Sequence, residues 1–438
     1  MIKKSFYIET YGCASNKADS NIISNLLIDS NYVRTSLSNA QFVIVNTCGV
    51  KQQTENKIKR RLGTLYERYK GSLNKYLIIT GCLPHIAATY IKVIENLVPN
   101  FGAIIDLNNI HEIPKILNEV KGGKRNIIVK SAQPIDKSQF QIHYPQGKIT
   151  GIIPISEGCL GACTYCCVKN ARGQLYCYNP LSILNNVKSQ LKQGIKQIYL
   201  TSQDCSTYKY AKTNLAELIG NIANLKEKFY LRLGMINPRF LVDELDQLIM
   251  IFNYDKVYKL FHMPIQSGSD DVLQKMNRTY RIKPVIENLK KLKEKVPNLS
   301  FSTDIICGFP GETESDFNKT IQLVKSLKPE ILNISKFTPR PGTKAKVMKQ
   351  INSKIIKERS MKLSDIFRES LINSNLEWEG WEGEVLVLHP GEEPNQAFGR
   401  NIAYKNVFIE EYSRDFGEFV KVKINKVEGF NLFALNSL

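Results

Sequence analysis

The sequence predicts an α/β protein with an N-terminal parallel α/β domain, a central partial (β/α)6 barrel and a small C-terminal β-barrel. Two successive stretches alternate short apolar runs with amphipathic segments, and the last stretch contains only short strands and turns. Alternation of strands with helices favours parallel sheets, because each helix returns the chain across the sheet before the next strand begins. With 438 residues, the chain is long enough for two to four domains of about 100–200 residues each.

The first alternating series occupies residues 1–130 and predicts the N-terminal domain. A polar stretch at residues 131–147 then indicates a linker. The candidate strands are Ser5–Glu9, Phe42–Asn46, Tyr76–Thr80 and Ala103–Ile105, and the clearest helical patterns are Ile22–Ile28 and Ile58–Tyr69.

The second series occupies residues 148–372. Six strand-helix units within about 200 residues are more typical of a partial parallel barrel than of an open sheet. The candidate strands are Gly151–Ile155, Gln197–Thr201, Tyr230–Gly234, Leu260–Pro264, Ser300–Ile306 and Ile331–Phe337. The helical segments between them include Leu181–Gln193, Leu215–Lys226 and Ser315–Leu327.

The tail, residues 373–438, has room for a small β-barrel, and its charge differs from that of the rest of the chain. It carries six basic and eleven acidic side chains, so the preceding residues hold +24 although the whole chain has +19. Such a balance favours a polyanionic partner. The segment Arg340–Glu369, with nine basic and three acidic side chains, fits a solvated helix face or a phosphate-contacting surface equally well. The candidate tail strands are Gly383–Leu388, Val407–Ile409 and Phe419–Ile424.

Composition excludes several classes of protein. Hydrophobic residues make up 43% of the chain, which excludes disorder throughout. No apolar run approaches the roughly 18 residues that a membrane span needs, and Glu9 interrupts the apolar start of the chain, so we expect a soluble, cytoplasmic protein without a signal peptide. Ten cysteines are too few for a disulfide scaffold and are more typical of metal binding or redox chemistry.

Three cysteines form one compact motif, Cys159-x3-Cys163-x2-Cys166, directly after a predicted barrel strand. Three thiolates can hold three irons of a four-iron cluster and leave the fourth iron open. Thiolates also suit zinc, for which Cys167 or Cys177 could supply a fourth ligand.

Cys13, Cys48 and Cys82 each lie just past the end of a predicted N-terminal strand, beside a glycine. The carboxyl ends of parallel strands share one edge of a sheet, where ligands usually bind. These cysteines are therefore expected to converge on a second cluster; the alternative is three buried thiols.

The loop of Cys159, Cys163 and Cys166 resembles the signature of the radical S-adenosylmethionine (SAM) enzymes. Together with the earlier cysteines, the chain resembles the methylthiotransferase family over almost its whole length. The resemblance implies a methylthiotransferase N-terminal domain, a radical SAM core and a TRAM-like tail, with two [4Fe-4S] clusters and SAM as cofactors. Cys167, Asn170 and the acidic tail depart from the family pattern.

Within that family, three segments are most similar to the archaeal and eukaryotic branch: Tyr7–Ser20, Asn46–Lys51 and Lys169–Gly173. This implies methylthiolation at C2 of N6-threonylcarbamoyladenosine at position 37 of tRNA, beside the anticodon. In this scheme one SAM molecule methylates a sulfur at the auxiliary cluster. A second SAM molecule receives an electron from an electron donor and is cleaved, which gives a 5′-deoxyadenosyl radical that activates C2. The alternatives are isopentenyladenosine tRNA or a ribosomal-protein aspartate as substrate, or a zinc-containing RNA-binding protein without catalysis.

The resemblance also suggests SAM contacts, while no catalytic residue is predicted. Arg232 could clamp the SAM carboxylate or be a barrel-rim charge. His262 is expected to be a hydrogen-bonded core residue. The remaining cysteines, Cys177, Cys205 and Cys307, are expected to be buried without a metal role. The candidate SAM-binding residues are Gln203, Arg232, Gln266, Ser267 and Gly308.

Overall fold

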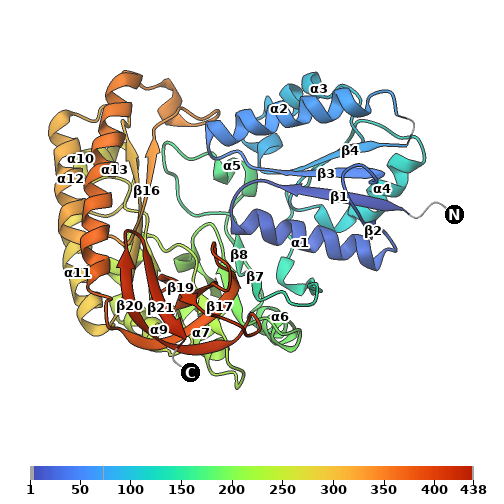
Figure 1. The fold of residues 1–438 in the computed structure, drawn as a ribbon. Helices are drawn as coiled ribbons and strands as arrows, with labels where there is room; N and C mark the ends of the chain where they lie inside the picture. Colours follow the sequence, from blue (N-terminus) through green and yellow to red (C-terminus); the bar gives the residue numbers. More distant parts are fainter. Residues whose placement is uncertain (1–3, 73, 437–438) are drawn as a thin grey trace.

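The computed structural model describes residues 4–72 and 74–436. It contains an N-terminal sheet covered by helices on both faces, a central half-barrel and a C-terminal β-barrel (Figure 1). This is the predicted fold class. The outermost ends of the first and last predicted domains, residues 1–3 and 437–438, lie outside the described residues.

Within the described part of the chain, the N-terminal sheet has six parallel strands in the order β2-β1-β3-β4-β5-β6. The inner strand β3 (Phe42–Thr47) is buried on both faces, because Phe42 and Ile44 pack under one helix layer while Val43 and Val45 pack under the other. The strands are β1 (Ser5–Thr10), β2 (Val33–Arg34), β3 (Phe42–Thr47), β4 (Tyr76–Gly81), β5 (Ala103–Ile105) and β6 (Ile127–Val129). The helices are α1 (Ala14–Asp29), α2 (Gln52–Tyr69), α3 (Tyr90–Leu97) and α4 (Ile113–Lys121).

The four predicted N-terminal strands are confirmed, whereas β2 and β6 were not predicted. Both are edge strands. β2 has only two residues, and the three apolar residues of β6 stand between basic and polar ones, so neither shows a clear strand pattern. Residues 131–147 pack against both neighbouring units, since Ile142 is buried in the N-terminal core and the Lys137 side chain is 1% exposed. This connection is therefore held in place by tertiary contacts.

The central unit is an open (β/α)6 barrel. Strands β7-β10-β13 and β14-β15-β16 form two parallel groups, and a bridge between Leu231 and Val257 joins them. The strands are β7 (Thr150–Pro154), β10 (Gln197–Thr201), β13 (Tyr230–Arg232), β14 (Leu260–His262), β15 (Ser300–Cys307) and β16 (Ile331–Lys336), as predicted to within a few residues. The helices are α5 (Val168–Arg172), α6 (Pro180–Lys192), α7 (Leu215–Ala223), α8 (Pro238–Asp243), α9 (Leu245–Asn253), α10 (Asp270–Lys275), α11 (Ile282–Lys295) and α12 (Glu314–Leu327). Short hairpins are formed by β8 (Ser156–Glu157) with β9 (Tyr176–Cys177) and by β11 (Lys209–Tyr210) with β12 (Thr213–Asn214).

A long helix, α13 (Ser353–Leu376), packs on β16 and leads into the tail (Figure 1). The tail is a closed barrel in the order β17-β18-β19-β21-β20, and it packs against one end of the half-barrel through Tyr230, Tyr258 and Tyr404. The strands are β17 (Glu382–Pro390), β18 (Ala397–Asn401), β19 (Asn406–Glu410), β20 (Phe419–Glu428) and β21 (Asn431–Asn436), of which β18 and β21 were not predicted. Among the described helices, none has an apolar stretch long enough to cross a lipid bilayer.

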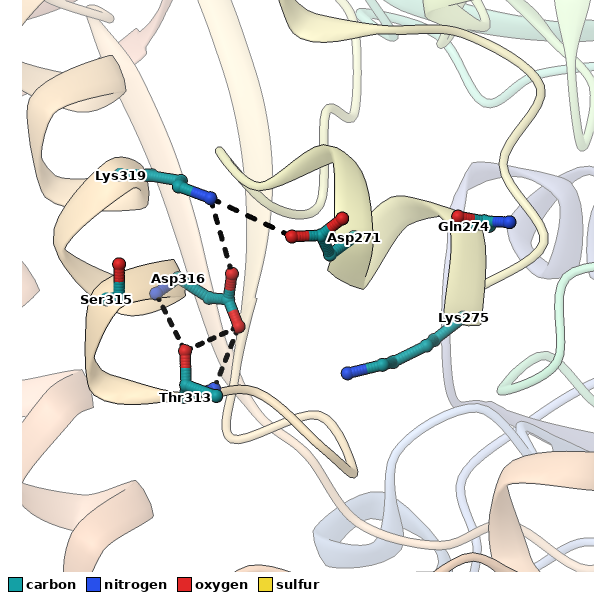
Figure 2. Close-up of a pocket in the computed structure, with 7 residues that line it drawn as sticks. All are labelled: Asp271, Gln274, Lys275, Thr313, Ser315, Asp316 and Lys319. Atoms are coloured by element: carbon teal, nitrogen blue, oxygen red, sulfur yellow. Dashed lines mark hydrogen bonds and ion pairs between the residues drawn. The ribbon is translucent and has the colours of Figure 1, made fainter.

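A groove of about 630 Å³ lies between α10 and the start of α12 (Figure 2). Asp316 caps α12 by accepting hydrogen bonds from Thr313, and it also accepts one from Ser269 at 2.6 Å. Burial alone would raise the pKa of Asp316, but these hydrogen bonds and the charge of Lys319 outweigh burial and hold it at about 2. The groove is lined by Asp271, Gln274, Lys275, Thr313, Ser315, Asp316 and Lys319.

We expect Asp316→Asn to flatten the acid dependence of folding stability. In the unfolded chain the carboxyl regains its ordinary pKa of 3.8. Its stabilising contribution is therefore complete above pH about 4 and is lost as the pH falls towards about 2. Urea unfolding across this range should show a shallower loss of stability for Asp316→Asn than for the natural chain. Asp271→Asn, at a 72% exposed position in the same groove, should leave the slope unchanged.

Candidate active site

The cysteine loop begins at the carboxyl end of the first barrel strand, where the β8–β9 hairpin holds its base. Gly158 donates its backbone N–H to Gln203 Oε1 at 2.7 Å. Its φ is +82°, and a Cβ there would lie 1.9 Å from the carbonyl oxygen of Gln174, so this turn requires glycine. Gln203, a predicted SAM contact, therefore braces the loop.

Two of the three sulfur atoms of this loop, those of Cys159 and Cys163, lie close to Gly161. Its N–H donates to Cys159 Sγ at 3.2 Å, and a Cβ on Gly161 would lie 3.2 Å from Cys159 Sγ and 3.8 Å from Cys163 Sγ. Arg278 Nη1 donates to Cys163 Sγ at 3.4 Å. Burial raises the pKa of Cys159 and raises that of Cys166 to about 12. Ionisation of these thiols therefore needs a nearby cation, which ligated iron supplies.

A cavity of about 740 Å³ opens beside Cys163, a size typical of small-molecule sites. Polar side chains line it, including Asp204, Asn237 and Arg278. Burial raises the pKa of Asp204, partly offset by hydrogen bonds from Ser206. The first barrel strands thus present hydrogen-bonding groups next to the cysteine loop.

None of the five predicted SAM-binding residues is among the described residues that line this cavity. Ser267 is fully buried, and its hydroxyl oxygen accepts from the Ser269 N–H. Gln266 lies at φ +74° with its backbone paired to β15. Gly308 lies at φ +78°, and a Cβ there would lie 2.3 Å from Ile356 of α13. The structure therefore shows each of these three residues shaping a strand-end loop.

Arg232 lies on the inner face of the half-barrel, since its neighbours Leu231 and Leu233 point into the helix-covered core. Its guanidinium lies 4.9 Å from the ring centroid of Tyr199 and 5.2 Å from that of Tyr404 in the tail barrel. The structure thus places Arg232 beside the tail, with no contact to the cysteine loop among the described interactions.

His262 also faces inward, and this corrects the expectation of a core histidine. Its Nε2 lies 2.7 Å from Asp304 Oδ2, so the side chain is hydrogen-bonded as expected. The His262 side chain is 21% exposed, and that of Asp304 is 29% exposed. The alternation of β14 turns His262 away from the apolar core, which its neighbours Phe261 and Met263 enter instead.

The second cysteine triad, Cys13, Cys48 and Cys82, lies at the ends of the adjacent strands β1, β3 and β4. Cys82 donates its backbone N–H to the Thr47 carbonyl at 2.8 Å, which sets it beside Cys48. A Cβ on Gly12 would lie 3.1 Å from Cys48 Sγ, which brings the Cys13 turn to the same point. Cys13 is exposed, whereas Cys48 and Cys82 are buried.

The two triads approach each other through Cys167. This buried thiol follows Cys166 directly, and its Sγ donates to the carbonyl oxygen of Gly49, the residue after Cys48, at 3.4 Å. Arg340 Nη2 donates to the same carbonyl at 2.6 Å and to Glu55 at 2.6 Å, which fixes the N-terminal sheet against the barrel. The cysteine loop and the N-terminal sheet edge therefore face one another.

Cys205 and Cys307 are fully buried, as expected. The expectation is wrong for Cys177, which is only partly buried because it lies in the short edge strand β9, where its Sγ accepts from the Lys209 N–H at 3.4 Å. In the described part of the chain, no three His, Cys, Asp or Glu side chains lie close enough to hold a single metal ion. Each triad offers three soft thiolates on turns that contain glycine, a donor set that fits a four-iron cluster.

Sequence reasoning missed several charged residues of the site. Arg278 lies in a polar segment without any recognisable pattern, and only the tertiary fold brings it to Cys163. Arg172 appeared only within a branch-specific segment, yet its side chain is 3% exposed and bonds to Asp19 and Glu157. Lys137 fell in the predicted linker.

Comparison with known families agrees with this geometry. Residues 153–324 match the Radical SAM superfamily, residues 5–100 match Uncharacterized protein family UPF0004, and residues 378–435 match the TRAM domain. A structure of the radical S-adenosylmethionine methyltransferase TsrM from Kitasatospora setae shares the fold, with a TM-score of 0.59 and 12% identity over 78% of this chain and 75% of that one. The fold and the cysteine loop define a radical SAM enzyme, whose cofactors are SAM and a [4Fe-4S] cluster.

The relatives narrow this class to one family. A probable threonylcarbamoyladenosine tRNA methylthiotransferase of Pyrococcus horikoshii is 37% identical over 95% of this chain and 96% of its own length. A tRNA-2-methylthio-N(6)-dimethylallyladenosine synthase of Clostridium botulinum is 33% identical over 98% and 96%. The chain belongs to the radical SAM methylthiotransferase family and is a transferase.

Gly161→Ala should impair cluster binding by the cysteine loop, because the added methyl group would lie in tight contact with Cys159 Sγ and close to Cys163 Sγ. We expect a lower iron content after anaerobic reconstitution and slower formation of 5′-deoxyadenosine from SAM. Gly63→Ala is the control, since a Cβ there meets nothing within 4 Å. Full iron content in Gly161→Ala would contradict the arrangement of the sulfurs.

Proposed function

We propose that this protein methylthiolates C2 of N6-threonylcarbamoyladenosine at position 37 of tRNA, with a second [4Fe-4S] cluster on Cys13, Cys48 and Cys82. The observation that carries the proposal is the second triad, which faces the first across the Cys167–Gly49 contact. One triad would serve SAM cleavage alone, whereas two facing triads suit a reaction that also delivers sulfur.

The loop of Cys159, Cys163 and Cys166 would hold the cluster that binds SAM, and the N-terminal triad would hold the auxiliary one. When bound, the first cluster would supply the electron for reductive cleavage of SAM, and the auxiliary cluster would hold the sulfur that a second SAM methylates. The chain's own part is positioning: Gln203 braces the loop, and Arg278 contacts the sulfur of Cys163.

The inner face of the half-barrel suits a polar substrate. Arg232, His262 and Asp304 point inward and remain partly exposed. The threonylcarbamoyl group is polar and carries a carboxylate, so it is matched by a face with one cation, Arg232, and further hydrogen-bonding groups. An isopentenyl group offers nothing to such groups. The relative of Pyrococcus horikoshii, which is named for the threonylcarbamoyl substrate and is 37% identical to this chain, supports the same choice.

Charge supports tRNA as the partner. The chain before the tail carries +24, and six lysines of the segment Arg340–Glu369 are exposed. Arg359 of the same segment is instead buried, and its Nη1 lies 2.7 Å from Glu312 Oε2. These lysines are available to phosphates of the anticodon arm. An electron donor and a cytoplasmic location belong to the same proposal.

Substitutions in the two triads should separate cleavage from sulfur insertion. Loss of any cysteine in the loop should abolish 5′-deoxyadenosine formation, because cleavage needs that cluster. Loss of any cysteine in the N-terminal triad should leave some uncoupled cleavage without methylthiolated product. Iron should fall from about eight to about four per chain in either set. The two sets are Cys159→Ala, Cys163→Ala and Cys166→Ala, and Cys13→Ala, Cys48→Ala and Cys82→Ala.

Cys307→Ala, a fully buried position, is the control and should keep both clusters. Full methylthiolation by a variant of the N-terminal triad would overturn the auxiliary site.

The substrate is tested by mass spectrometry of tRNA nucleosides from cells with and without this protein. We expect loss of 2-methylthio-N6-threonylcarbamoyladenosine and accumulation of its precursor. Loss of the methylthiolated isopentenyl nucleoside instead would reassign the enzyme within its family. Unchanged tRNA with loss of a methylthio group from a ribosomal aspartate would contradict the tRNA proposal.

A further inference from the structure

Four buried charges form a closed ring between the N-terminal sheet and the barrel. Lys137 lies 2.8 Å from Asp19 and 2.7 Å from Glu157, and Arg172 lies 2.8 Å and 2.7 Å from the same two carboxylates. All four side chains are 1–6% exposed. The two cations balance the two anions, so the ring is neutral as a unit.

The two cations of the ring have different surroundings. Arg172 Nη2 donates to Asn16 Oδ1 at 3.2 Å, and the Cys13 thiol donates to the same oxygen at 3.4 Å. Asn16 also donates to the Thr47 carbonyl, one residue before Cys48, at 2.9 Å. A single amide thus ties Arg172 to the turns that carry two cysteines of the N-terminal triad.

Besides its contact with Asn16, Arg172 interacts electrostatically with the cysteines of this triad. Burial alone would lower the pKa of Arg172, but the charges of Cys82, Asp19, Glu157 and Cys13 outweigh burial and raise it. In the opposite direction, Arg172 counteracts the rise that burial causes in the pKa of Cys48 and Cys82.

The Cys82 side chain is buried, and a negative charge on a buried sulfur needs a compensating positive charge. Three thiolates around a [4Fe-4S] cluster carry a net negative charge that grows by one electron on reduction. A guanidinium that is itself buried and lies beside such a group favours the reduced state, because its charge is poorly screened.

We propose that Arg172 is a positioning residue for the auxiliary cluster: its buried positive charge favours cluster binding at the N-terminal triad and raises the cluster's reduction potential. The other three members of the ring hold the guanidinium in place. This role rests on the proposed function, which supplies the second cluster.

The ring itself provides a matched pair of variants. Asp19→Asn with Arg172→Gln, and Asp19→Asn with Lys137→Gln, each remove one carboxylate and one cation, so both leave a neutral buried pair. They differ in which cation remains, and only Arg172 contacts Asn16 beside Cys13. Both changes are made in the full-length chain carrying Cys159→Ala, Cys163→Ala and Cys166→Ala, in which only the auxiliary cluster can assemble.

The measurements are iron content after anaerobic reconstitution and the midpoint potential from a redox titration followed by electron paramagnetic resonance. The variant without Arg172 should show a reduction equilibrium about tenfold less favourable, which is about 59 mV for one electron, or should fail to retain iron. The variant without Lys137 should keep both properties. Arg172→Lys retains the positive charge, so its midpoint potential should stay close to that of the chain with Arg172.

Equal midpoint potentials and equal iron contents in the two double variants would overturn the proposed role of Arg172. The ring would then only hold the two units together. The proposal would also be overturned if Arg172→Lys shifted the midpoint potential as much as Asp19→Asn with Arg172→Gln does, because the positive charge would then not be the cause of the shift. Failure of the triple-alanine chain itself to bind a cluster would overturn the second cluster as well, which marks a failure of the proposed function.

Discussion

The buried ring of Lys137, Asp19, Arg172 and Glu157 is the interaction on which the relative placement of the two cysteine triads depends. Each charge belongs to a different segment. Asp19 lies in α1 and Lys137 in the connection at residues 131–147, whereas Glu157 lies in β8 and Arg172 ends α5. Removing a charge from water is costly, and it is tolerated only where each charge meets its partners with good geometry. The ring therefore defines one docking arrangement, since any sliding of the sheet against the barrel would leave an unpaired buried charge.

A second constraint follows from the parallel strands of both units. Their carboxyl ends carry the functional turns, and the fold sets these two edges against each other, with α5 between them (Figure 1). The contacts of Cys167 and Arg340 with the Gly49 carbonyl close this junction. In the proposed reaction a substrate atom must reach both triads, and that reaction requires a fixed junction.

The tail illustrates a different principle. Its net negative charge conflicts with direct attraction to RNA, and its contact with the half-barrel is largely aromatic and aliphatic. The guanidinium of Arg232 lies near the rings of both Tyr199 and Tyr404 at this junction. A residue that was predicted to bind SAM through its charge therefore contacts aromatic rings. The attraction for a polyanion lies instead on the preceding domains, whose charge is +24.

The sequence by itself determined the three-part fold and both cysteine triads, because hydrophobic periodicity and the position of cysteines after strand ends are local signals. It missed the edge strand β2, which has only two residues, and the edge strand β6, whose three apolar residues stand between basic and polar ones. It placed Lys137 in a linker because that segment is polar. Only the tertiary structure decided that Arg278 meets Cys163 and that Arg172 meets Asp19, Glu157 and Asn16. These partners lie up to 156 positions apart in the chain, and such contacts are created by packing and leave no mark on the local pattern of residues.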